Sequence, residues 1–256
     1  MTAPQSTAQS NSESLLTHYQ DGVATFTISR PDCRNALDPD TYGALSHALK
    51  TADARSDIHA IIITGAAGHF TAGNDLRAFQ TAGTGARAGM DFLHTIVAID
   101  TPIIAAVEGS AVGIGVTMLL HCDFVFMADN AKLRLPFVSL GLCPEGASSL
   151  LLAQVVGARK ASDWLLSARM FNGTEAAAAG LATASVAAGE TLSHAQHAAA
   201  HLAQQPRDAL RLTKVMQREP LREAITQTLN YESEKFGERL QSPEAQAAFA
   251  KFFSKS

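Results

Sequence analysis

The chain has 256 residues and a net charge of −4; 46% of its residues are hydrophobic and only 17% are charged. This composition is that of a globular protein, and it excludes disorder, collagen and coiled coil for the bulk of the chain. An acidic chain without a run of Lys or Arg has no electrostatic footprint for nucleic acid, so we expect no nucleic-acid partner.

The cysteines and the first residues of the chain indicate the cellular compartment. Three cysteines with no CxxC pair predict neither a disulfide framework nor a structural zinc, and they suit a reducing compartment. Residues 1–13 are polar, lack the features of a signal peptide, and are predicted to be a disordered tail. The most apolar stretch, 103–120, contains Glu108, Ser110 and three glycines, so we expect no membrane partner. We therefore expect a cytoplasmic protein.

The first part of the chain alternates between strand and helix patterns. Residues 23–29 alternate apolar and polar side chains like a half-buried strand. Asp38 and Pro39 are suited to start a helix that runs to about residue 54. The Gly- and Ala-rich stretch 81–89 has no packing pattern and predicts a mobile loop. Short apolar, β-branched segments predict buried strands at 60–64 and 102–107.

The remaining patterns divide the chain into a mixed part and a helical part. Strands are predicted at 123–127 and 132–135, and helices at 113–121, 148–156, 161–167 and 175–179, the last with Thr174 as its N-cap. From about residue 191 only amphipathic helices are predicted, at 191–204, 206–217, 219–240 and 243–253. The expected fold is α/β, with parallel units covered by helices.

Several common catalytic motifs are missing from the sequence. There is no Gly-Lys-Ser/Thr phosphate loop, no GxSxG elbow and no HExxH pair. The Gly113-Ile114-Gly115 segment lacks the third glycine of a dinucleotide loop. The sequence therefore predicts no metal site and no bound cofactor.

Two small-residue turns, 70–76 and 108–117, each follow a predicted buried strand and lead into a helix. Such turns expose backbone N–H groups at a helix N-terminus, where the partial positive charge favours an anion. Two of them side by side could form an oxyanion hole. Tight loops that serve only close packing would have the same composition.

A third segment, 140–149, places Glu145 between apolar residues. A carboxylate that is partly desolvated there has a raised pKa, which suits a general base. The alternative is a surface glutamate at a helix start, stabilised by the helix dipole.

These segments, in this order and spacing, resemble the crotonase superfamily, also called the enoyl-CoA hydratase/isomerase family. The resemblance covers the chain after about residue 14. It rests on Arg30-Pro31 with Asn35-Ala36-Leu37, on Ala72-Gly73-Asn74-Asp75-Leu76, on Ala106-Val107-Glu108-Gly109, and on the closing pattern Phe236, Leu240, Ser242, Glu244 and Ala248. It implies a crotonase-like ββα spiral at 14–195 and a helical C-terminal trimerisation region at 196–256. It also implies an acyl-CoA substrate, enolate chemistry, and a homotrimer or hexamer.

Carried over by position, the resemblance implies oxyanion-hole N–H groups at Asn74 and Ile114. The two catalytic glutamates of the hydratases fall on Thr117 and Phe137, neither of which moves a proton at neutral pH. The 140–149 segment is similar instead to peroxisomal-type Δ3,Δ2-enoyl-CoA isomerases, whose single base falls on Glu145. The expected reaction is therefore isomerisation of a 3-enoyl-CoA. The alternative reactions are hydration, ring isomerisation and a displacement. A further alternative is a non-catalytic scaffold that binds acyl-CoA or RNA.

Substrate-binding residues follow from the same resemblance. The phosphates of CoA are expected at basic side chains near the first turn and the C-terminus, namely Arg34, Arg77 and Lys251. The backbone of Ala72 is expected to contact CoA. The acyl chain is expected in an apolar pocket lined by Phe79, Phe92 and Phe137.

Overall fold

The computed structural model describes residues 11–12, 14–77 and 84–254, and a seven-stranded sheet forms its centre. The strand order is β1-β2-β3-β4-β5-β7-β10. The bounds are β1 Asn11–Ser12, β2 Leu15–Gln20, β3 Val23–Ile28, β4 Ala60–Gly65, β5 Ile103–Val107, β7 Phe124–Ala128 and β10 Ala184–Val186. The strands from β3 to β10 are parallel, whereas β1, β2 and β3 pair antiparallel. A second sheet consists of β6 Ser110–Val112, β8 Lys132–Arg134 and β9 Met170–Asn172.

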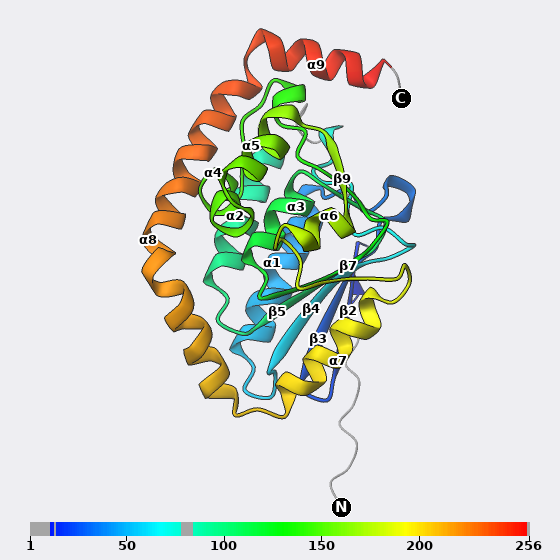
Figure 1. Cartoon of the computed structure of the whole chain (residues 1–256), viewed down its shortest axis with the longest axis vertical. Coiled ribbons are helices and arrows are strands. Elements are labelled where there is room, and N and C mark those ends of the chain that lie inside the picture. Colours follow the sequence, from blue (N-terminus) through cyan, green and yellow to red (C-terminus); the bar gives the residue numbers. More distant parts are fainter. Residues whose placement is uncertain (1–10, 13, 78–83, 255–256) are drawn as a thin grey trace, which may run out of the picture.

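Helices cover the central sheet and extend beyond it (Figure 1). Their bounds are α1 Pro39–Ala54, α2 Thr84–Ala98, α3 Ile114–Thr117, α4 Ser148–Val156, α5 Ala158–Ser167, α6 Gly173–Ala178, α7 Thr191–Ala203, α8 Arg207–Leu240 and α9 Pro243–Phe253. Short 3₁₀ helices lie at η1 Pro31–Cys33, η3 Met118–His121 and η4 Val138–Leu140. Among the described helices, none has the length and apolar character needed to cross a membrane.

The parallel strands bury side chains on both faces. On one face, Ile62 and Ile104 form a cluster with Ala195 and Ala199 of α7, whose small side chains allow a close approach. On the other face, Ile61 of β4 belongs to the main core, which α1 also enters. Burial on both faces explains the continuous apolar runs of these strands.

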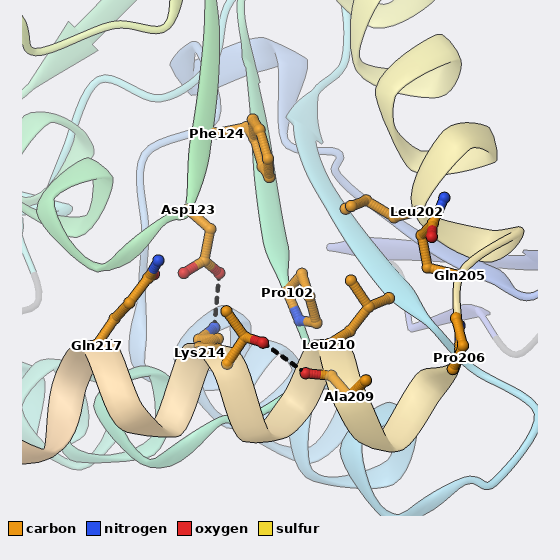
Figure 2. A pocket seen from close by; sticks show the side chains of 11 residues that line it. Pro102, Asp123, Phe124, Leu202, Gln205, Pro206, Ala209, Leu210, Lys214 and Gln217 are labelled. Atoms are coloured by element: carbon orange, nitrogen blue, oxygen red, sulfur yellow. Dashed lines mark hydrogen bonds and ion pairs between the residues drawn. The ribbon is translucent and has the colours of Figure 1, made fainter.

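Helix α8 is a single 34-residue helix, where the sequence predicted two helices at 206–217 and 219–240. Pro220 lies inside it; proline removes one backbone hydrogen bond and kinks a helix without always ending it. Figure 1 shows α8 running along one side of the molecule. Near its start, Lys214 pairs with Asp123 at 2.7 Å, as Figure 2 shows. Tertiary contacts of this kind keep the helix continuous despite the proline.

Other predicted elements need correction. The stretch expected to be a loop at 81–89 enters α2 at Thr84, and its earlier residues lie outside the described part. Asn172 rather than Thr174 caps α6, because its Oδ1 accepts from Glu175 N at 2.8 Å. Strands β2, β6, β9 and β10 were not predicted. Within the expected tail, Asn11 and Ser12 pair with β2, and the expected boundary at 195 falls inside α7.

Asn35 ties the end of β3 to the end of β4. It is fully buried, and its Nδ2 donates to the carbonyls of Ala66 at 2.9 Å and His69 at 2.7 Å. Its Oδ1 accepts from Arg30 N at 2.9 Å. We predict that Asn35→Ala lowers the free energy of unfolding by about 3 kcal/mol, because three partly buried backbone groups lose their partners. Urea denaturation measures this.

The matched control is Asn230→Ala on the exposed side of α8. We expect it to change stability by no more than about 0.5 kcal/mol, as surface substitutions do. Equal losses in the two variants would contradict the role given to Asn35.

Candidate active site

The two small-residue turns lie side by side at the carboxyl ends of β4 and β5. Thr71 N donates to Ser110 O at 2.9 Å, and Val112 N donates to Thr71 O at 3.2 Å, so Thr71 and Ala111 form a parallel β-bridge. The first turn also pairs with the segment after η1. The two turns therefore lie side by side, as the sequence analysis considered.

The backbone N–H of Asn74 points away from its bridge partner. The bridge with Leu37 uses the carbonyl of Gly73 and the N–H of Asp75, at 2.8 and 2.9 Å. Because successive backbone groups of an extended segment alternate in direction, the Asn74 N–H faces the opposite side. Gly73 permits the close approach: its φ is +88°, and a Cβ there would lie 2.4 Å from Val112 O.

Ile114 begins α3 directly after Gly113, its N-cap. An N–H in the first turn of a helix has no intrahelical acceptor and is available to an anion. Asn74 and Gly113, which directly precedes Ile114, line one cavity. The Ile114 side chain itself is fully buried in the core.

The cavity has a volume of about 1780 Å³. The expected residues that line it are Arg34, Ala72, Asn74, Arg77, Phe137 and Glu145. Phe92 does not line it: it is fully buried and packs on Tyr42 with ring centroids 5.5 Å apart. Lys251 is exposed on α9, whose Phe252 and Phe253 line the cavity instead. Phe79 lies outside the described residues.

Glu145 is buried at this cavity, with 8% of its surface exposed, so it is not the surface glutamate of the alternative. Its Oε1 has no hydrogen-bond partner among the described residues. Its pKa is raised from 4.5 to about 8, mainly by burial. The negative charge of Glu232 also raises this pKa, and a hydrogen bond from the Asn74 side chain lowers it. A carboxyl with such a pKa can both take and return a proton near neutral pH.

Tyr42 is a residue at this site that the sequence did not indicate. It lies on α1, is buried, and its hydroxyl donates to Asn74 Oδ1. Since that bond occupies the carbonyl of the amide, the Asn74 NH₂ group is the part that faces Glu145. The pKa of Tyr42 is raised well above 10, mainly by burial, so it stays a donor. Its sequence position in a helix core gave no signal of this role.

The positions of the expected hydratase glutamates are both buried. Thr117 is fully buried on α3, and its Oγ1 has no partner among the described residues. It lies against the next residue after Glu145, because a Cβ at Gly146 would be 2.7 Å from its Oγ1. Phe137 is 3% exposed. Neither side chain offers an ionisable group beside Glu145.

The basic residues of the cavity extend beyond the expected ones. Lys132 and Arg134 of β8 also line it. Lys132 is exposed and, within the described part of the chain, forms no ion pair. Surface lysines are common, so the sequence alone did not distinguish it.

A second cavity of about 280 Å³ lies at the opposite, amino ends of β5 and β7 (Figure 2). Pro102, Phe124 and Leu210 are among its lining residues. Its charged residues, Asp123 and Lys214, pair with each other, and Lys214 also donates to Thr101 O at 2.9 Å. Among the described residues that line this cavity, no unpaired acid or base could perform proton transfer.

Comparison with known proteins adds to this geometry. Residues 18–256 match the family model described as enoyl-CoA hydratase/isomerase. The chain belongs to this family. Its α/β fold with a helical C-terminal region is that of solved members. An enoyl-CoA hydratase/isomerase from Pseudoalteromonas atlantica T6c has a TM-score of 0.90 at 35% identity, covering 94% of this chain and 97% of that one.

Curated members of the enoyl-CoA hydratase/isomerase family carry both kinds of name. The Mycobacterium bovis protein "Probable enoyl-CoA hydratase echA8" is 31% identical, over 95% of this chain and 96% of its own. "Enoyl-CoA delta isomerase 2" of Rattus norvegicus is 34% identical, over 67% of this chain and 46% of its own. The protein is therefore an enzyme of this family, and the site must distinguish the reactions.

The buried acid makes stability depend on pH. Because the folded-state pKa of Glu145 is about 8 and its ordinary value is 4.5, the folded protein holds this proton more tightly. The stability that the folded protein gains from holding this proton is therefore fully present below pH 4.5. It is lost as pH rises through about 8. We predict that Glu145→Gln is more stable than wild type at pH 8.5 by about 2–4 kcal/mol, and equal to it at pH 4.5.

Urea unfolding at the two pH values tests this, with Glu223→Gln on the exposed side of α8 as the control that removes the same charge. A difference between wild type and Glu145→Gln that does not change with pH would contradict the raised pKa.

Proposed function

We propose that this protein is a Δ3,Δ2-enoyl-CoA isomerase in which Glu145 is the single proton-transfer group. The observation that carries this proposal is the buried carboxyl of Glu145, with an oxygen that has no partner among the described residues, at the cavity that Asn74 and Gly113 also line. Thr117 and Phe137, at the positions expected for hydratase glutamates, supply no acid of their own. Hydration needs a positioned and activated water, and neither Thr117 nor Phe137 can share that work with Glu145.

The reaction divides into two proton transfers. Ionised Glu145 takes a proton from C2 of the 3-enoyl thioester, and the thioester oxygen becomes an enolate. The backbone N–H groups of Asn74 and Ile114 stabilise that oxygen. Protonated Glu145 then returns the proton to C4, so the double bond lies between C2 and C3. No water and no redox step enters the balance.

Asn74 joins the two halves of this mechanism. Its N–H serves the enolate oxygen, and its side-chain amide, oriented by Tyr42, donates to Glu145. Preorganised donors of this kind add no reorganisation at the moment of reaction. The proton donor and the oxyanion hole are therefore fixed relative to each other by one residue.

The cavity also supports the CoA part of the proposal. Arg34, Arg77 and Lys132 line it and would bind phosphates, while the buried face of Phe137 would contact the acyl chain. Ala72, at the first turn, lines the same cavity. Lys251, away from the lining, has no such support.

Assembly as a homotrimer or hexamer is part of the proposal. Helix α8 exposes large apolar side chains, namely Leu212, Met216 and Tyr231, at 60%, 67% and 62% of their surfaces. Side chains of this kind favour contact with another subunit.

We predict that Glu145→Gln abolishes turnover of 3-hexenoyl-CoA and leaves binding of the CoA thioester intact, because only the proton acceptor is lost. Ultraviolet absorption of the conjugated product measures turnover, and calorimetry measures binding. When the wild-type enzyme reacts in deuterated water, part of the product should carry at C4 the proton taken from C2. Full activity of Glu145→Gln, or a 3-hydroxyacyl product from trans-2-hexenoyl-CoA at a comparable rate, would contradict the proposal.

The oxyanion donor proposed at Ile114 can be removed by substitution with proline. Proline is tolerated at the first position of a helix, where it removes the N–H alone from the backbone. We predict that Ile114→Pro lowers kcat by about 10²–10³-fold, as the loss of one oxyanion donor does. Ile114→Val keeps the N–H and should keep kcat within about threefold. Circular dichroism checks that both fold; equal kcat values in the two variants would exclude Ile114 N–H as a donor.

A further inference from the structure

A second buried acid lies beside Glu145, on a helix far along the chain. Glu232 of α8 is 3% exposed. Its Oε2 accepts from Ala147 N at 2.6 Å, and its Oε1 accepts from Ser149 N at 2.9 Å and from Ser149 Oγ at 2.6 Å. These donors belong to the start of α4, directly after Glu145.

The turn between Glu145 and α4 depends on this contact. Ala147 is the N-cap of α4, has a φ of +55°, and has no side-chain oxygen with which to cap the helix. A non-glycine residue in the left-handed region requires support from its surroundings. Glu232 supplies the cap from outside and satisfies N–H groups that the sequence near α4 leaves open.

We propose that Glu232 is a positioning residue of the reaction: its carboxylate, held by the start of α4, fixes the turn that presents Glu145 and places a second buried negative charge beside it. This inference rests on the proposed function of Glu145. The burial of Glu232 is explained by its hydrogen bonds to the α4 N-terminus, whose partial positive charge favours an anion.

The electrostatic consequence follows from the order of ionisation. Burial raises the pKa of Glu232, but the hydrogen bonds from Ser149 and Ala147 lower it and favour the charged form. The pKa of Glu145 is raised by that charge, in addition to burial. Glu232 therefore ionises first, and its charge then makes ionisation of Glu145 harder.

Other titratable groups face this pair or its turn: Tyr42, His121, Cys143 and Arg239. Burial raises the pKa of Tyr42 and of Cys143 and lowers that of His121 to about 4, so these three are neutral at pH 7. Arg239 pairs with Glu244. Within the described residues, no cation forms an ion pair with either buried acid.

The test is the pH dependence of kcat/KM for 3-hexenoyl-CoA in wild type, Glu232→Gln and Glu234→Gln. Wild type should gain activity with a midpoint near pH 8, where Glu145 ionises. In Glu232→Gln the midpoint should fall by about one pH unit, because the neighbouring charge is gone. The plateau should also fall about tenfold or more, because the turn is less well held.

Glu234→Gln is the matched control: it is the same substitution on the same helix, but Glu234 is exposed and paired with Lys235. It should leave the midpoint unchanged, because solvent screens its charge. A purely structural role for Glu232 would lower the plateau and leave the midpoint in place, and this result would overturn the inference.

Carbon-13 NMR titration of glutamate carboxyls in the wild-type protein gives a second measurement, independent of turnover. The resonance absent in Glu145→Gln identifies Glu145. A Glu145 midpoint near 8 with a second step from Glu232 supports the inference; a single step near 4.5 overturns it. If wild type does not isomerise 3-hexenoyl-CoA, the proposed function fails, and the titration still decides whether the two acids are coupled.

Discussion

The site depends first on Thr71, which holds three chain segments in one arrangement. Its backbone joins the first turn to the second, through Ser110 and Val112. Its side-chain hydroxyl donates to Asn35 O at 2.6 Å and accepts from Gly73 N at 3.0 Å. Because Thr71 is fully buried, these bonds are protected from competition by water. The spacing between the two proposed oxyanion donors is thereby set by backbone pairing rather than by mobile side chains.

Beside these hydrogen-bonded turns the protein buries an acid, Glu145. An ionised carboxyl in an apolar site is unfavourable, and it usually becomes protonated instead. Glu145 is in this situation, and the hydrogen bond from Asn74 opposes the effect only in part. The protein thus keeps a group that weakens the folded state as pH rises, and in return the acid has a pKa suited to taking and giving back one proton.

Local sequence patterns were sufficient for part of this picture. Asp38 caps α1 as expected, and the buried strands at β4 and β5 follow from their apolar runs. The family resemblance indicated Asn74 and Glu145, whereas composition alone indicated only the turns in which they lie. Phe92 was misplaced because an aromatic residue of a core helix and one of an acyl pocket have the same local pattern.

The site residues that could not be predicted from the sequence make contacts with residues far away in the chain. Tyr42 reaches Asn74 across 32 positions, and Glu232 reaches Ala147 across 85. No periodicity or motif encodes such a contact, since it depends on how helices pack. The continuity of α8 through Pro220 is a related case: propensity predicts a break, and packing overrides it.

These long-range contacts change the role assigned to the C-terminal helices. The expected division places a catalytic spiral at 14–195 and an assembly region at 196–256, yet Glu232 of the second part bonds the turn that carries Glu145 of the first. Arg239 likewise donates to Gly141 O at 2.8 Å, in the same loop. A helix that completes the N-terminus of α4 cannot be removed without leaving buried N–H groups unpaired. The helical region is therefore part of the structure that determines the proton affinity of Glu145, whatever further contacts its outer face makes.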